Sequence, residues 1–127
     1  MGLILAVGSQ PELIEMITVA VRGTDYQIHR VKDPGKVPHV VESVHVDAVI
    51  VDIHETGKTI TGMDVAEAIR EQGNNETIVI AVSDESADKY VALAAGFDAF
   101  LVQPFDFSRL RATLQMYLSE AGMTLRT

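Results

Sequence analysis

Several polar residues that could do chemistry stand directly after apolar runs of this chain. Asp52 follows the run at residues 47–51, and a polar loop containing a glycine comes next. A carboxylate in that position can act as a nucleophile or a ligand, or it can bond to its own loop and begin a turn. Both roles are open from the residue type alone, so the surroundings of Asp52 must decide between them.

The same arrangement occurs at other places in the chain. Residues 3–7 lead to Gly8-Ser9, residues 78–82 lead to Ser83-Asp84, and residues 97–102 lead to Gln103-Pro104. Short continuous apolar runs are typical of strands that are buried on both faces of a sheet. In a parallel sheet these polar residues would gather outside the carboxyl ends of the strands, where such sheets bind ligands.

The remaining apolar pattern predicts the elements that hold these segments in place. Strands are expected at residues 3–7, 26–31, 47–53, 78–82 and 97–102. Helices are expected at residues 11–21, at 63–71, from a cap at 83–85 to residue 95, and along a final core stripe of Phe107, Leu110, Leu114 and Tyr117. Residues 37–44 are a poor helix candidate because they are β-branched and include Pro38. This alternation predicts one α/β domain over residues 1–127, a flavodoxin-like, doubly wound, five-stranded parallel sheet with helices on both faces.

Composition narrows the class of protein further. The chain has a net charge of −8, which argues against nucleic-acid binding by this domain, because phosphate contacts need clustered Lys and Arg. It has no Cys, which excludes a disulfide scaffold and a cysteine nucleophile. Its apolar runs are too short for a membrane span, and its first residues lack the charged start of a secretion signal. A cytoplasmic protein without membrane attachment is therefore expected.

Over nearly its full length the chain resembles a response-regulator receiver domain of the CheY-like kind. The resemblance rests on the order and spacing of segments 4–13, 46–52, 62–70, 79–83 and 94–105. The last segment reads AAGFDAFLVQPF, where the family has Ala-Gly-Ala, an aromatic residue and then Lys-Pro. The resemblance implies a signalling module of a two-component or phosphorelay system.

The resemblance also implies a role for each matching residue. Asp52 matches the aspartate that accepts a phosphoryl group. Ser83 best matches the hydroxyl that bonds this group, although pairing the fourth helix without gaps puts Ala81 there instead. Phe100 matches the aromatic residue whose rotamer reports activation; alternatively it is only a half-buried strand residue. Gln103-Pro104 matches the family's cis peptide bond.

Three charged groups of the family's site are replaced in this chain. The two acidic Mg²⁺ ligands would fall at Gly8 and Ser9, and the lysine would fall at Gln103. Asp52 is then the one obvious acidic ligand, so Mg²⁺ is expected to bind poorly, and no other cofactor is expected. A transferred phosphoryl group would also lack its counter-charge. The resemblance therefore implies an atypical site with at most weak self-phosphorylation at Asp52, and not an enzyme.

Other interpretations of the same residues stay open. His54 or Glu55 could supply substitute metal ligands, or they could be solvated loop residues. Ser9 could bind an anion with a helix N-terminus behind it, or it could simply cap that helix. Asp52, His54 and Gly57 also match the Asp-x-His-x-x-Gly pattern of cobalamin-binding domains, in which the histidine ligates cobalt. In those domains, however, the motif follows the first strand and a Gly-Gly element comes later, and this chain has no Gly-Gly.

The resemblance finally implies how the domain would act. A sensor kinase or a downstream protein would bind the face made by the fourth helix, the fifth strand and the last helix, centred on Tyr90, Phe100 and Tyr117. A homodimer could use the same face. Within this interpretation a pseudo-receiver that works without phosphate is preferred over a degenerate receiver that is still phosphorylated. The alternative function is a small-ligand binder or enzyme that uses the cleft at the strand tips.

Overall fold

The computed structural model describes residues 2–118, in which strands and helices alternate along the chain. The strands are β1 (Gly2–Val7), β2 (Tyr26–Val31), β3 (Ala48–Asp52), β4 (Ile78–Ser83) and β5 (Ala99–Val102). The α-helices are α1 (Pro11–Ala20), α2 (Val37–Ser43), α3 (Val65–Glu71), α4 (Lys89–Ala94) and α5 (Phe107–Leu118). Short 3₁₀ turns precede three of them, namely η1 (Pro34–Lys36), η2 (Gly62–Asp64) and η3 (Ser86–Asp88).

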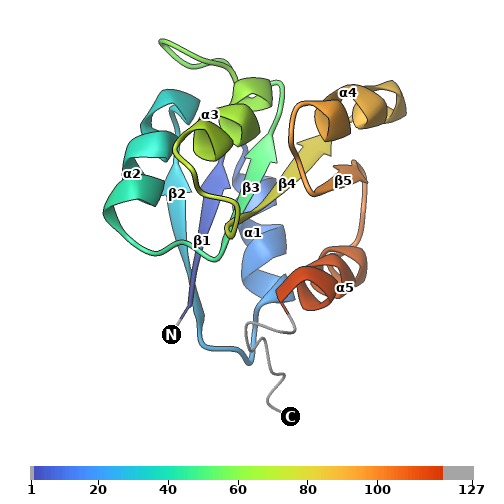
Figure 1. Ribbon diagram of the computed structural model, residues 1–127. Helices are drawn as coiled ribbons and strands as arrows, with labels where there is room; N and C mark the ends of the chain where they lie inside the picture. Colours follow the sequence, from blue (N-terminus) through green and yellow to red (C-terminus); the bar gives the residue numbers. More distant parts are fainter. Residues whose placement is uncertain (1, 119–127) are drawn as a thin grey trace.

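The five strands form one parallel sheet in the order β2-β1-β3-β4-β5, as the sequence predicts. In Figure 1 the strands run upward, so their carboxyl ends meet at the upper edge of the sheet. The central strands β1, β3 and β4 are almost completely buried, because apolar residues face both sides of the sheet. The loops that follow these strands therefore share the edge where a functional site is expected.

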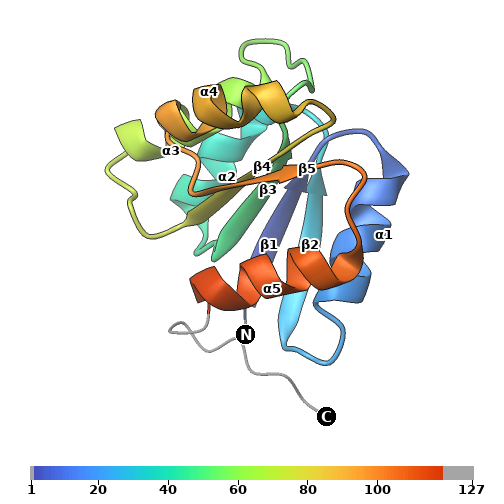
Figure 2. The same ribbon diagram turned by 90° about the vertical axis from the view of Figure 1, so that its right-hand side faces the viewer.

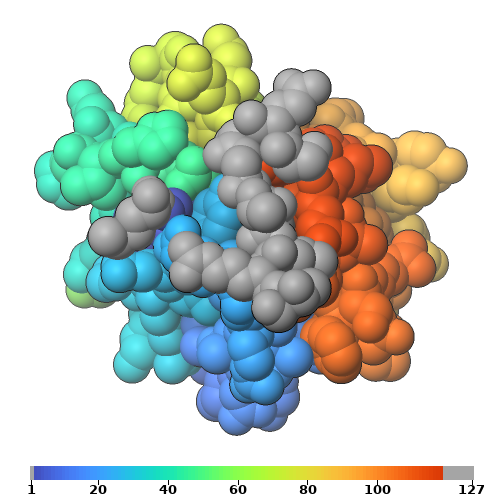
Figure 3. Space-filling view, turned by 90° about the horizontal axis from the view of Figure 1, so that it is seen from below, coloured from blue at the N-terminus to red at the C-terminus, as the bar shows by residue number. Residues whose placement is uncertain are grey.

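Helices cover both faces of the sheet. Figure 2 shows α1 and α5 on one face and α2, α3 and α4 on the other. Each face has its own core of aliphatic side chains, in which the helices pack against the alternating residues of the strands. Helices α1 and α5 lie side by side, as Figure 3 shows from below, and a side-chain nitrogen of Arg111 donates to the carbonyl oxygen of Ala20 at 3.2 Å.

Two of the predicted helices are wrong in detail. The fourth helix does not begin at a cap at 83–85, because Ser83 still belongs to β4 and its hydroxyl accepts from the backbone N–H of Glu85 at 3.0 Å. The chain therefore makes a turn and the 3₁₀ segment η3 before α4 begins. In α5 the buried stripe is Leu110, Leu114 and Leu118, whereas Phe107 stands at the exposed start of the helix.

The weak helix candidate at residues 37–44 does form a helix, α2 over Val37–Ser43. The carboxylate of Asp33 accepts from the backbone N–H of Gly35 at 2.9 Å and starts η1, which leads directly into α2. Pro38 lies in the first turn, where its missing N–H costs nothing. Val37 and Val41 then pack into the core, so burial outweighs the low helix propensity of the segment.

Gly62 brings the long loop after β3 back against the strand tip. Its backbone N–H donates to the carbonyl oxygen of Glu55 at 2.8 Å. A Cβ at this position would overlap the carbonyl oxygen of Asp52, so any larger residue would push the loop away from the strand. Gly62 thus fixes the distance between the loop and the end of β3.

Candidate functional site

The fold brings the predicted site residues together at the carboxyl edge of the sheet. Asp52 is the last residue of β3 and Ser83 the last residue of β4. A Cβ built on Gly8 would lie 3.3 Å from the Cβ of Asp52, so these two residues are in contact. The backbone N–H of Gln103 donates to the carbonyl oxygen of Ser83 at 2.7 Å. The expected cluster therefore exists as a set of neighbouring positions.

Asp52 is half-buried and bonds to its own loop. Its Oδ1 accepts from the backbone N–H of His54 at 3.0 Å, and its carbonyl oxygen accepts from the N–H of Glu55 at 3.1 Å. Both contacts are those of an aspartate that begins a turn. The role of phospho-acceptor remains a prediction.

Ser83 lies at the strand tip, whereas Ala81 is fully buried inside the sheet, paired with Val51 and Phe100. Of the two candidates, only Ser83 carries a hydroxyl, and it is 1% exposed. This hydroxyl donates to Oδ2 of Asp88 at 2.7 Å. Its function in binding phosphate remains a prediction, since in this structure the protein itself supplies its hydrogen-bond partners.

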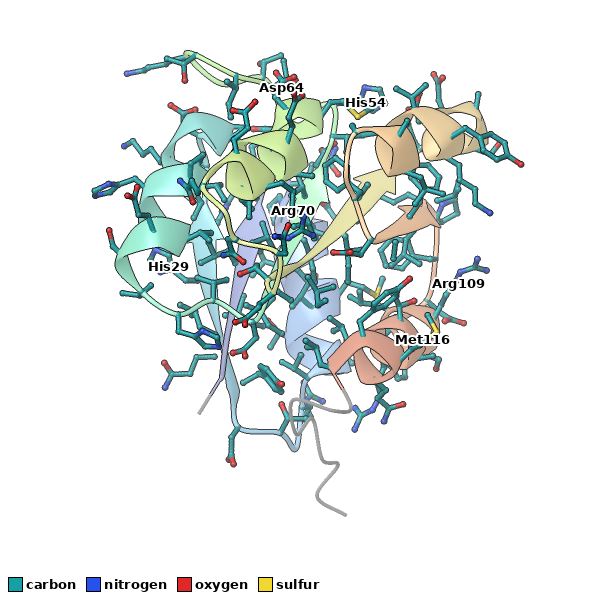
Figure 4. All side chains as sticks on the ribbon, viewed as in Figure 1. His29, His54, Asp64, Arg70, Arg109 and Met116 are labelled. Carbon is teal, nitrogen blue, oxygen red and sulfur yellow. The ribbon has the colours of Figure 1, made fainter. Side chains whose placement is uncertain are left out.

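His54 is the residue whose contacts the sequence does not reveal. Its side chain reaches from the loop after β3, between α3 and α4 (Figure 4), to the start of α4. The Nε2 atom lies 2.8 Å from Oδ2 of Asp88 and 3.2 Å from the Ser83 hydroxyl. The hydrogen bond to Asp88 raises the pKa of His54 above its ordinary value, with smaller contributions from the charges of the neighbouring aspartates. The pKa of Asp88 is lowered, first by the Ser83 hydroxyl and then by His54.

The loop after β1 also differs from expectation. Ser9 does not cap α1, because the residue in the cap position is Gln10, and Gln10 makes no capping side-chain bond. The Ser9 hydroxyl instead donates to the carboxylate of Glu55 at 3.2 Å. The Arg30 side chain, which the sequence does not single out, donates to the carbonyl oxygens of Gly8 at 3.3 Å and Ser9 at 2.6 Å. The Arg30 guanidinium therefore lies beside Gly8 and Ser9, the two positions at which the family's acidic ligands are expected.

Comparison with known proteins decides the family. The model of the response regulator receiver domain matches residues 4–115. The chain belongs to the response regulator receiver domain family.

Curated relatives of this receiver domain include the DNA-binding response regulator MtrA of Mycolicibacterium smegmatis, 26% identical over 116 residues, which cover 88% of this chain and 50% of MtrA. The two-component response regulator PhoP of Pseudomonas aeruginosa is 32% identical over 96 residues, which cover 75% of this chain and 42% of PhoP. The chain thus spans about half the length of the curated relatives it matches. Receivers are signalling domains of two-component systems rather than enzymes, and they interact with kinases and other proteins.

The solved structures agree on the fold. The chemotaxis response regulator CheY4 of Vibrio cholerae matches with a TM-score of 0.79 at 24% identity, covering 93% of this chain and 99% of that one. TrrA of Thermotoga maritima, solved in complex with Mg²⁺ and BeF, matches with a TM-score of 0.77 at 24% identity, covering 93% of this chain and 100% of that one. These likenesses confirm the predicted flavodoxin-like sheet.

The binding of Mg²⁺ to this receiver remains a prediction, and the structure shows what stands at the two positions expected for the family's acidic ligands. Gly8 has no side chain, and Ser9 is bonded to Glu55. Nowhere in residues 2–118 do three or more His, Cys, Asp or Glu side chains gather where they could hold a metal ion. Mg²⁺ demands near-octahedral oxygen coordination, usually with one or two carboxylates. His54 bonds to Asp88 and Ser83, and Glu55 accepts from Ser9. Their role as substitute metal ligands stays a prediction.

The segment after β5 has the predicted backbone. The peptide bond between Gln103 and Pro104 is cis. Gln103 lines a cavity of about 400 Å³ together with residues of α1 and of the loop after β4. Neither Asp52 nor Ser83 is among the residues that line it. The cavity and the predicted acceptor are thus separate features of this edge.

The predicted partner face is only partly exposed. Tyr90 on α4 is 79% exposed, and Val91 and Leu93 beside it are 58% and 39% exposed. Phe100 is half-buried in the edge strand β5, and Tyr117 donates its hydroxyl to the carbonyl oxygen of Asp98 at 2.8 Å. Exposed apolar side chains therefore lie on α4 and also on α5, where Phe107 and Met116 are 47% and 67% exposed. Within residues 2–118, no helix is long and apolar enough to cross a membrane.

Proposed function

We propose that this chain is a receiver domain that acts through protein–protein contacts and does not depend on a phosphoryl group at Asp52. The observation that carries this proposal is that polar groups at and near Asp52 are hydrogen-bonded to other groups of the protein. Asp52 accepts from His54, Ser83 donates to Asp88, and each contact is within 3.0 Å. A phosphoryl group would have to compete with both contacts.

Charge supports the same proposal. A phosphoryl group needs positive charge on its oxygens, and the position of the family's lysine is Gln103, which is uncharged. The guanidinium of Arg30 is engaged by the carbonyl oxygens of Gly8 and Ser9. Because each missing charge removes transition-state stabilisation, transfer to Asp52 would be slowed by at least about a hundredfold per group. We therefore propose that Mg²⁺ has no role in this domain.

We further propose that a partner protein binds the exposed face of α4, formed by Tyr90, Val91 and Leu93. All three side chains are exposed on a short helix that also packs against β5. Aromatic residues are enriched at the centres of protein interfaces, which favours Tyr90 as the anchor. A homodimer through the same face is the competing outcome.

Mass spectrometry tests the independence from phosphate. The protein is incubated with Mg²⁺ and acetyl phosphate, and its intact mass is measured over time. No phosphate adduct is expected on the wild-type chain, whereas the variant Ser9→Asp/Gln103→Lys, which returns one carboxylate and the lysine, serves as the positive control. A wild-type adduct that disappears in Asp52→Asn would refute the proposal.

Site-specific crosslinking tests whether a partner protein binds the exposed face of α4. A photoreactive amino acid is placed at Tyr90 or at Val44, which is 49% exposed at the end of α2 and serves as the matched control. A defined crosslinked product from position 90 and not from position 44 is expected in the native cells. A product whose mass is twice that of the chain would instead indicate the homodimer. Equal labelling from both positions would contradict a specific face.

A further inference from the structure

A single hydrogen-bonded cluster joins three segments of the domain near Asp52. The Nε2 atom of His54, in the loop after β3, lies 2.8 Å from Oδ2 of Asp88 in η3 and 3.2 Å from Oγ of Ser83 at the end of β4. Ser83 Oγ in turn donates to Oδ2 of Asp88 at 2.7 Å and accepts from the N–H of Glu85 at 3.0 Å. The turn between β4 and α4 is therefore held from both sides.

The arrangement is not that of a Ser-His-Asp catalytic triad. In such a triad the two imidazole nitrogens bond to different residues, so that the carboxylate orients the ring while the other nitrogen takes the serine proton. Here the same nitrogen, Nε2, faces both Asp88 and Ser83. The Ser83 hydroxyl is also 1% exposed, which leaves a substrate no access to it. The cluster is thus suited to holding segments together.

His54 also connects this cluster to Asp52. Its backbone N–H donates to Oδ1 of Asp52 at 3.0 Å, while its side chain bonds across to Asp88. One residue therefore contacts both the predicted acceptor and the segment that leads into α4. Two contacts of His54 thus connect the Asp52 carboxylate to η3.

We propose that His54 is the positioning residue of this receiver: it holds the segment from Ser83 to Lys89 in one conformation and links it to Asp52. The proposal deepens the proposed function, because it explains how the face of α4 stays in place when no phosphoryl group is present. In this role the contacts of His54 with Ser83 and Asp88 would hold the segment in place of a bond between the Ser83 hydroxyl and a phosphoryl group on Asp52. Loss of the imidazole is then expected to release the segment and loosen the first turn of α4.

Amide hydrogen exchange, measured residue by residue by NMR on the full chain, tests the positioning role. In His54→Ala the amides from Glu85 to Leu93 are expected to exchange about tenfold faster or more, which corresponds to about 1.4 kcal/mol. In His54→Gln, whose amide nitrogen can still donate to Asp88, exchange is expected to stay within about threefold of the wild type. Unchanged exchange in His54→Ala, or equal exchange in the Ala and Gln variants, would overturn the proposal.

A matched control exists at the other end of the sheet. His45 is also exposed, and its Nε2 lies 3.1 Å from the carboxylate of Asp47. His45→Ala is expected to leave the exchange of residues 85–93 unchanged. If both histidine variants loosen this segment equally, the effect is a general loss of stability and the positioning role is wrong.

A double-mutant cycle tests the link to Asp52. Asp52→Ala removes the acceptor of the His54 N–H and is expected to speed exchange in the segment from Glu85 to Leu93. The same substitution in the His54→Ala background is expected to add little, because the connecting side chain is already gone. Additive effects would refute the link. These outcomes are independent of phosphate: an adduct on Asp52 would refute the proposed function alone, whereas unchanged exchange would refute the role of His54 alone.

Discussion

Replacing Ser83 with alanine tests how much the strand tip depends on one hydroxyl. The substitution removes the acceptor of the Glu85 N–H, a bond of 3.0 Å, and the donor to Asp88, a bond of 2.7 Å. In this variant the carboxylate of Asp88 still bonds to His54 and still contacts water. Most of the lost stability therefore comes from the unpaired N–H of Glu85 and from the small void at residue 83, which is 1% exposed. A lost hydrogen bond of this kind costs about 1 kcal/mol, and the void adds a fraction of that, so the expected loss is about 1–2 kcal/mol.

Urea unfolding followed by circular dichroism measures this loss. For a small domain the free energy of unfolding falls by about 1–3 kcal/mol per molar urea; with a slope of about 2, the midpoint should drop by about 0.5–1 M. Ser86→Ala is the matched control, because Ser86 is exposed at the start of η3, and its midpoint should stay that of the wild type. Equal midpoints for the Ser83 and Ser86 variants would show that the hydroxyl is not held as the structure indicates.

Three further substitutions have defined outcomes. Asp88 raises the pKa of folded His54 above its ordinary value of about 6.5. Below that pH the domain should therefore be more stable with His54 than with His54→Gln, and the difference should vanish as the pH rises through the folded pKa. Thermal melts between about pH 5.5 and 8.5 measure this difference. Gly62→Ala would place a Cβ on the Asp52 carbonyl oxygen and should cost about 1–3 kcal/mol in urea unfolding; a wild-type midpoint would contradict this geometry. Arg70→Ala removes a partly buried pair with Asp98, joined at 2.8 Å, and should cost about 2 kcal/mol, while Arg70→Lys should recover less than half.

The sheet could be predicted because its signal is local. Strands β1, β3 and β4 are short apolar runs that end near small or polar residues, and they are buried on both faces, whereas β2 alternates apolar and polar residues. Asp52, Ser83 and Gln103 could be placed at one edge for the same reason, since the ends of parallel strands meet there. The sequence determines the ends of the helices less well. Helix α4 begins later than predicted, because a serine before a helix can cap it or begin a separate turn.

The contacts that shape the site could not be predicted from the sequence. His54 and Asp88 are 34 residues apart, and no spacing rule joins a loop after one strand to a turn after the next. The same holds for Arg30, which lies 21 residues from the carbonyl oxygen of Ser9 that it bonds. A histidine in a polar loop is ordinarily solvated, and only the packing of the β3 loop against η3 gives it a partner. The register of the sheet and the length of that loop decide this contact together.

A phosphoryl group at Asp52 would find the nearby hydrogen-bond donors already bonded to other groups of the protein. A site that is ready to bind an anion keeps donors free or paired with water, so that binding gains charge-assisted bonds without losing others. Around Asp52 the donors are already used: the His54 N–H by Asp52 itself, the Ser83 hydroxyl by Asp88 and the Arg30 guanidinium by two carbonyl oxygens. Phosphorylation would exchange these bonds for new ones with no added cation at Gln103. The resting arrangement should therefore persist after replacement of any single missing charge, and a gain in phosphorylation should need Ser9→Asp and Gln103→Lys together, with either substitution alone giving little adduct.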